Sequence, residues 1–302
     1  MNRVSTISLQ RTMALAIQES QQQLAVTQQQ LASGKKAQSY ADLGTETSRN
    51  LSARSMVDRQ EAQAVVAKRV GTTMEIYDAH TRGIEDSMES LRQAILTAVG
   101  TENGQGLDDA IQSAFENYRN SLNASEAGVS LFAGSRSDQQ PFQPTSLTDV
   151  AATPLANAFT NDQVKASANV ADGINVTYGI LASDVGGKLY EAFQSLAAMG
   201  SIGNGLSDAD KTALTNVVSQ LETGLSDVRN VVAENGRRQA RMDVFAERAD
   251  ARRTMLEEMV SANEDADLAE VALKMNQQRT ALEASYSVFA KLANLNLTKY
   301  LS

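Results

Sequence analysis

The chain has 302 residues, enough for about two domains, and its 27 basic and 36 acidic residues give a net charge of −9. An acidic chain lacks the positive surface that holds nucleic-acid phosphates, so we expect no nucleic-acid partner. The absence of cysteine excludes disulfides and thiolate zinc sites, and the single histidine, His80, argues against histidine-based catalytic triads. We therefore predict no catalytic residue, no cofactor and no metal ligand.

The first 33 residues predict a long helix with a weak apolar stripe. From Gln10 onward, positions spaced by three and four residues form a heptad repeat, of which four are apolar: Met13, Ile17, Leu24 and Leu31. Gln, Ser and Thr interrupt this seam, and Gly34 with the two lysines after it predicts the helix end. The longest apolar run here, residues 13–17, is too short for a membrane span or a secretory signal peptide.

A stronger stripe predicts a second helix, followed by a turn and a third. Eight positions between 70 and 95 alternate by three and four, which is the spacing of one helix face. They are Val70, Met74, Tyr77, Thr81, Ile84, Met88, Leu91 and Ile95. The glycine-rich stretch 100–106 predicts a turn, and residues 107–127 predict a helix with one apolar face.

The middle of the chain differs from both flanks. All three prolines, Pro141, Pro144 and Pro154, lie here, and proline disfavours long helices. Residues 174–180 alternate between apolar and polar side chains with period two, which predicts a strand. The middle also carries most of the net negative charge, which indicates a solvated surface.

The last third predicts long helices again. A stripe runs from Leu214 to Val232, and a final one places Leu268, Met275, Leu282 and Phe289 at intervals of seven, with Tyr286 between them. Between these stripes, residues 237–258 are rich in both arginines and acids. We expect Asp243 and Glu247 to pair with Arg248 and Arg252 in a mixed ionic face. This face is either solvated or in contact with a neighbouring subunit, and we favour the contact. The acidic residues 264–270 predict the amino-terminal end of a helix rather than a metal site.

These elements together predict a mainly α fold. It is an elongated antiparallel helical rod with paired N- and C-terminal coiled-coil helices and a small β-containing middle insertion. Residues 1–43 and 262–302 are expected to form the terminal coiled-coil domain, and residues 44–134 and 185–261 the helical rod. Residues 135–184 are expected to form a small strand-and-loop insertion that faces outward.

Short motifs near both ends resemble the flagellin superfamily. Residues 3–6 (Arg-Val-Ser-Thr) and 31–36 (Leu-Ala-Ser-Gly-Lys-Lys) resemble its amino-terminal region, and residues 264–270 its carboxy-terminal motif. Within the superfamily, residues 131–135 (Leu-Phe-Ala-Gly-Ser) and 281–289 resemble the hook–filament junction family, also called the hook-associated protein 3 family. The chain departs from both branches at residues 39–44, where a pair of aspartates is usual.

The resemblance implies a structural role outside the cell. Members are exported by the flagellar type III system without a cleaved signal peptide, and an export chaperone binds them first. They assemble with copies of themselves through their terminal helices, between hook-associated protein 1 on the hook side and flagellin on the filament side. The seam residues named above, Met13, Ile17, Leu24, Leu31, Leu268, Met275, Leu282, Tyr286 and Phe289, are the expected assembly residues.

Alternatives remain open at this point. The same superfamily motifs occur in flagellin itself, the subunit that forms the filament. An unrelated coiled-coil scaffold would also account for the apolar stripes. Because isolated helices gain most of their stability from packing an apolar face, we expect the two terminal helices to be disordered before assembly and to fold on insertion.

Overall fold

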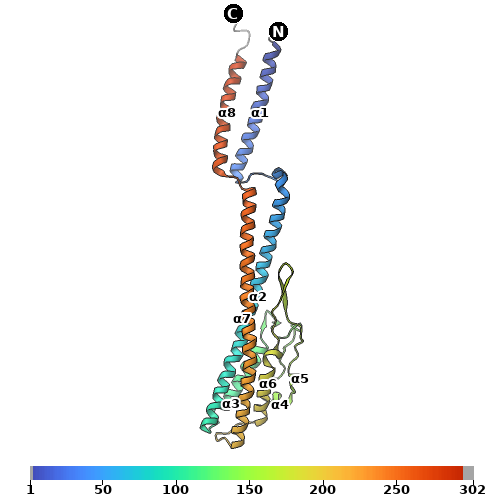
Figure 1. The fold of residues 1–302 in the computed structure, drawn as a ribbon, viewed down its shortest axis with the longest axis vertical. Helices are drawn as coiled ribbons and strands as arrows, with labels where there is room; N and C mark the ends of the chain where they lie inside the picture. Colours follow the sequence, from blue (N-terminus) through green and yellow to red (C-terminus); the bar gives the residue numbers. More distant parts are fainter. Residues whose placement is uncertain (1–2, 295–302) are drawn as a thin grey trace. The chain divides into compact units, whose positions relative to one another are not determined.

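A computed structural model describes residues 3–294 of the chain, which divide into two compact units. The terminal unit combines the residues up to Arg59 with those from Arg252 onward, and the central unit holds residues 60–251. The outermost parts of the predicted terminal domain, residues 1–2 and 295–302, lie outside the described residues. Long helices dominate both units, which confirms the mainly α prediction (Figure 1).

The terminal unit is built around two helices from opposite ends of the chain. Helix α1 (Arg3–Ser33) and helix α8 (Leu268–Asn294) lie side by side and antiparallel (Figure 1). Helix α1 ends as predicted at Gly34, whose φ of +70° suits glycine. Lys35 and Asp265 then form an antiparallel backbone bridge, and a short 3₁₀ helix, η1 (Tyr40–Glu46), leads to the next helix.

The central unit contains most of helix α2 (Thr47–Thr101) and helix α7 (Asp208–Glu264), together with helix α3 (Leu107–Leu122) and helix α6 (Ala182–Met199). Every residue of the stripe from Val70 to Ile95 is buried, and so are the stripe residues on α7: Leu214, Val218, Leu221, Leu225, Val228 and Val232. The periodicity of the sequence therefore located the core faces of the two longest helices correctly.

Aromatic side chains fill the centre of this core. Phe115 contacts Phe193 edge to face, with ring centroids 5.5 Å apart, and Tyr118 contacts Phe142 at 5.2 Å. The buried Tyr118 hydroxyl donates a hydrogen bond of 2.8 Å to the carbonyl of Gly186. A Cβ at Gly186 would lie 2.5 Å from that hydroxyl, so the close approach of α3 to α6 requires glycine.

The middle of the chain adds short helices and strands to the central unit. They are β1 (Ser125–Glu126), β2 (Val129–Ser130), α4 (Leu147–Ala152), α5 (Leu155–Ala158), β3 (Ser167–Ala171) and β4 (Ile174–Thr177). Each strand pair is an antiparallel hairpin. The β3–β4 hairpin packs Val170 and Val176 against Val70, Met74 and Met242 of the two long helices.

One helix and one strand end earlier in the structure than the sequence predicts. The helix expected to reach residue 127 stops at Leu122, because the side chain of Asn123 leaves the helix and exchanges two hydrogen bonds of 2.9 Å with the backbone of Phe142. The strand expected over 174–180 stops at Thr177, because the next two backbone amides both donate to the carbonyl of Ala166. Long-range contacts that leave no local signal set both ends.

Within residues 3–294, none of the helices combines the length and the apolar composition that crossing a bilayer would need.

The aromatic core generates the first prediction. Replacing the fully buried Phe115 by alanine leaves a cavity, so Phe115→Ala should lower the free energy of unfolding of the central unit by about 3–5 kcal/mol. Leu96→Ala, at a side chain that is 43% exposed, is the matched control and should change it by under about 1 kcal/mol. Denaturant unfolding followed by circular dichroism measures both, and equal losses would contradict this assignment of the core.

Candidate assembly site

The face of α1 that packs on α8 is the seam expected from the sequence. Met13, Ile17, Leu24 and Leu31 are all half-buried, and the positions between them are the polar residues of the same heptad. Thr27, one of these, is only 2% exposed, and its hydroxyl donates to the carbonyl of Gln23. The heptad positions predicted for α1 are therefore buried or half-buried in the structure.

On α8, most of the predicted row at intervals of seven residues faces α1, but the position predicted between its members, Tyr286, does not. Met275 and Phe289 are half-buried and Leu282 is buried, whereas Leu268 and Tyr286 are 50% and 44% exposed. The second buried row is Val271, Gln278 and Ser285, each four residues before a member of the first row. Tyr286 lies at the edge of the pair, where its hydroxyl accepts a hydrogen bond from Nε2 of Gln21. That these residues act in assembly stays a prediction.

The antiparallel register makes the seam alternate between apolar and polar layers. The Gln21–Tyr286 hydrogen bond and the Lys35–Asp265 bridge place Leu24 at the level of Leu282, and they place Thr27 at the level of Gln278. Within the described part of the chain, the buried Oε1 of Gln278 has no hydrogen-bond partner. An unsatisfied buried acceptor is destabilising, so α1 and α8 hold each other weakly.

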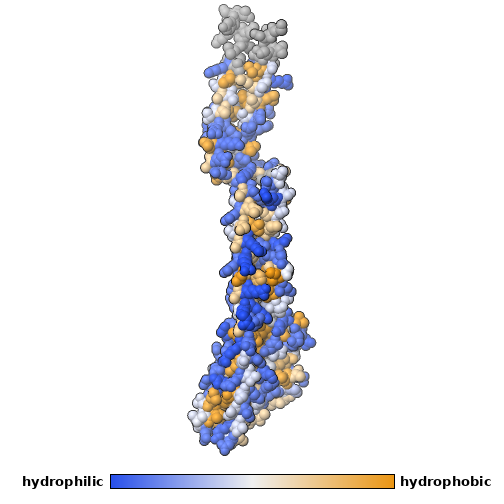
Figure 2. Space-filling view, in the orientation of Figure 1, coloured by the Kyte–Doolittle hydropathy of each residue, from blue (hydrophilic) through white to orange (hydrophobic). Residues whose placement is uncertain are grey.

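Large apolar side chains also lie on the outer faces of this helix pair, away from the seam. Leu15 and Val26 of α1 are 61% and 52% exposed, and Leu273 and Val288 of α8 are 60% and 45% exposed. Leu15 and Val26 are eleven residues apart, which is about three helical turns, so they share one face. Figure 2 shows apolar side chains exposed on the surface of this helix pair.

Few charges accompany these outer apolar residues. The 31 residues of α1 contain two arginines and one glutamate, but eight glutamines. Uncharged amides can be buried against another protein at lower cost than ions, because ions must give up strong hydration. The outer surface of α1 is therefore suited to contact with further helices.

A buried carboxylate joins the chain segments at the base of this pair. Glu264, 7% exposed, accepts hydrogen bonds from Arg54 Nε (2.8 Å) and Nη2 (2.6 Å) and from Asn50 Nδ2 (2.5 Å). Lys35 Nζ lies 3.4 Å from Glu264 and 2.5 Å from the carboxylate of Asp265. Because Arg54 donates to the carboxylate, the pKa of Glu264 falls to about 2, well below its ordinary value. This Glu264 cluster ties α2, α7 and the segment after α1 together.

The acidic residues 264–270 thus play two different roles. Asp267 caps α8 by accepting hydrogen bonds from the amides of Ala269 (2.9 Å) and Glu270 (3.2 Å), as expected for acids at the start of a helix. The prediction was wrong for Glu264, which ends α7 and pairs with Arg54. No local pattern indicates this role, because Arg54 lies 210 residues away in the chain.

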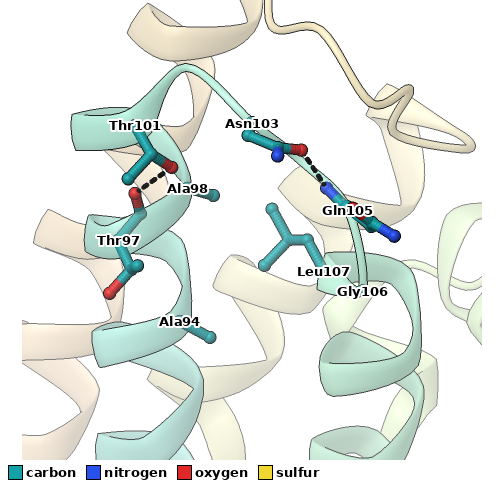
Figure 3. Close-up of a pocket in the computed structure, with 8 residues that line it drawn as sticks. All are labelled: Ala94, Thr97, Ala98, Thr101, Asn103, Gln105, Gly106 and Leu107. Carbon is teal, nitrogen blue, oxygen red and sulfur yellow. Dashed lines mark hydrogen bonds between the residues drawn. The ribbon is translucent and has the colours of Figure 1, made fainter.

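A hollow at the turn between α2 and α3 carries little chemistry. Its volume is about 370 Å³, and Asn103 Oδ1 there accepts a hydrogen bond of 2.9 Å from the amide of Gln105. Figure 3 shows the residues that line it. None of its eight lining side chains is ionisable. His80 lies elsewhere, its ring edge-on to Phe132 at 6.3 Å, and burial lowers its pKa below the ordinary value. No group of three or more potential metal ligands occurs within the residues that the structure describes.

Comparisons with known proteins give a family match over part of the chain and similar folds among solved structures. Residues 197–301, about a third of the chain, match the family model described as the bacterial flagellin C-terminal helical region. The fold is similar to that of a structure described as a flagellar hook-associated protein from Vibrio parahaemolyticus, with a TM-score of 0.62 and 16% sequence identity; the match covers 74% of this chain and 100% of that one.

A second similar structure is FlgL of Bacillus cereus, with a TM-score of 0.55 and 14% identity over 70% of this chain and 98% of that one. No curated protein matches the sequence. The family match confirms the resemblance to the flagellin superfamily over residues 197–301, and the fold of the chain is similar to the folds of these two structures.

The Glu264 cluster generates the second prediction. Glu264→Gln removes the charge that Arg54 and Lys35 neutralise, so it should destabilise the terminal unit by about 2 kcal/mol at pH 7. Because the pKa of Glu264 is lower in the folded chain than the ordinary 4.5, its stabilisation is complete above pH 4.5 and is lost as the pH falls toward 2. The difference in the free energy of unfolding between the variant and the unaltered protein should therefore become smaller as the pH falls from 4.5 toward 2.

Limited proteolysis within residues 47–59 and 252–264, the parts of α2 and α7 that carry Arg54 and Glu264, measures this effect during denaturant titration at pH 7 and at pH 3. Asp265→Asn is the matched control. Because Asp265 is 44% exposed in its pair with Lys35, this substitution should lower the stability of the terminal unit less than Glu264→Gln does. A Glu264→Gln effect that stays constant from pH 7 to pH 3 would contradict the role of the carboxylate.

Proposed function

We propose that this chain is a structural subunit of the bacterial flagellum that joins the hook to the filament. The observation that carries the proposal is the exposed apolar surface on the outer faces of α1 and α8, which a single chain leaves uncovered. Similar helices from neighbouring subunits would cover it. This role is structural and requires no catalytic residue or cofactor.

The build of the terminal unit supports assembly through these helices. The α1–α8 seam contains polar layers and one unsatisfied buried amide, so the pair alone gains little from folding. Packing of Leu15, Val26, Leu273 and Val288 against other subunits would remove further apolar surface from water, at about 25 cal/mol per Å². Folding of the two helices and assembly are therefore coupled in this proposal.

The partners follow from the same proposal. Copies of the chain form a ring or short tube, which contacts hook-associated protein 1 on one side and flagellin on the other, after export with a chaperone. The location is outside the cell. Residues 1–43 and 262–302 would form the assembling core, residues 44–134 and 185–261 the surrounding rod, and residues 135–184 the outward module.

Flagellin is the alternative function within the same superfamily. The match to the flagellin C-terminal helical region fits both functions. Two of the solved structures with a similar fold are named as a flagellar hook-associated protein and as FlgL, which favours the junction subunit. The two functions differ in the length of the assembly that the chain forms.

The third prediction separates these two functions. A strain that lacks this chain should build complete hooks and release flagellin into the medium, because the filament has no attachment site. Immunogold labelling of native flagella should place the chain at the hook end only. Labelling along the whole filament, or purified protein that extends filament seeds, would instead identify the chain as a flagellin.

The fourth prediction tests the outer faces directly. Leu15→Ser combined with Leu273→Ser removes two side chains that are at least 60% exposed, so the free energy of unfolding should change by less than about 1 kcal/mol. Incorporation into flagella should fall at least tenfold. Gln22→Ser with Gln277→Ser, at exposed polar positions on the same two helices, is the matched control and should assemble normally. Normal incorporation of the leucine variant would contradict the proposed contact.

A further inference from the structure

One segment of α7 in the central unit has its charges sorted onto two sides. Met242, Ala246 and Ala249 are 1%, 6% and 5% exposed, so they mark the buried face of this segment. Successive residues of an α-helix are rotated by about 100°. A residue directly before or after a buried position therefore lies on one or the other flank of the buried face.

Arginines occupy one flank. Arg241 directly precedes Met242 and Arg248 directly precedes Ala249, so both lie on the same side of the buried face, two helical turns apart. Both side chains are exposed. The Arg241 guanidinium lies 5.4 Å from the centre of the Phe245 ring, a contact that limits the freedom of this side chain. We call Arg241 and Arg248 the basic flank.

Acids occupy the opposite flank. Asp243 directly follows Met242, and Glu247 directly follows Ala246, so both lie on the other side of the buried face. Both are exposed, and within the described residues neither is part of an ion pair or a side-chain hydrogen bond. We call Asp243 and Glu247 the acidic flank. The nearby Asp250 differs, because Lys68 Nζ lies 2.8 Å from its carboxylate.

This arrangement overturns the ionic pairing expected from the sequence. Among the described ion pairs, none joins Asp243 or Glu247 to Arg248 or Arg252. Asp243 and Glu247 are instead four residues apart on one face, a spacing at which like charges repel within a helix. The two flanks therefore form no ion pairs with each other within the helix. Each flank carries charges that nothing in the described chain neutralises.

We infer that the basic flank of one chain binds the acidic flank of a second copy, side by side. The inference rests on the proposed function, in which copies form a ring. Both flanks lie at the same level of one helix, so a neighbour placed laterally presents Asp243 and Glu247 where Arg241 and Arg248 need partners. Two different patches meet in such a contact, and repetition of a contact of this kind closes a ring when the rotation permits. Complementary charge would also fix the alignment of neighbouring subunits.

Charge reversal tests this contact in flagella of a strain that lacks the native chain. Arg241→Glu with Arg248→Glu makes both flanks acidic, and Asp243→Arg with Glu247→Arg makes both basic. Each double variant should incorporate at least tenfold less than the unaltered chain, because like charges then face each other. The variant with all four changes exchanges the flanks, so incorporation should recover. Recovery distinguishes a direct contact from a general effect of charge.

The absence of native cysteine allows a second, independent test. A mixture of chains carrying Arg241→Cys with chains carrying Asp243→Cys should give disulfide-linked dimers of the two variants in assembled material. Either variant alone should give none. Arg69→Glu, at an exposed arginine on α2, is the matched control for charge reversal and should incorporate normally, and circular dichroism verifies that every variant folds.

The outcomes separate this inference from the proposed function. If the unaltered chain is found at the hook end but either double variant incorporates normally, the flank contact is wrong and the function stands. Failure of the fourfold variant to recover, with no mixed dimer, likewise overturns the contact. If the unaltered chain itself is absent from the hook end, the proposed function fails first.

Discussion

The terminal unit depends on one constraint: two helices side by side can each bury only one stripe. Leu24 and Leu282 lie on those stripes, while Leu15 and Leu273 are left in solvent. In the central unit, several helices pack around one aromatic core and the β3–β4 hairpin covers Val70 and Met74, so long apolar stripes on α2 and α7 are covered within the chain. The contrast between a closed core and an open helix pair explains why we assign assembly to the terminal unit.

Polar interactions complete this division. The Glu264 cluster holds the ends of α2 and α7 together, and hydrogen bonds from Arg54 lower the pKa of its carboxylate to about 2. The seam beyond it is weak, because Gln278 and Thr27 lie among the apolar layers. A stable Glu264 cluster and a weak α1–α8 seam suit the proposed assembly, in which the outer faces of these helices would leave water and pack against neighbouring subunits.

Charge in the central unit has a different use in this picture. Surface ion pairs contribute little to the stability of a folded chain, since solvent screens them. The lack of ion pairs at the two flanks of α7 therefore costs the folded chain little stability. In the inferred contact these charges align neighbouring copies instead. Apolar contacts through the terminal helices would then supply most of the affinity, and charged contacts along α7 would supply the register.

The sequence by itself determined the long helices, the stripes on α1, α2 and α7, the stop at Gly34 and the resemblance to the flagellin superfamily, because periodicity and helix-end chemistry act over a few residues. Tertiary structure decided which second row of α8 faces α1, placing Val271 inside and Tyr286 at the edge. It also decided the partner of Glu264 and the separation of charge around Met242. These features depend on residues far apart in the chain or on the rotation of a helix about its axis, and both are fixed only when the helices pack.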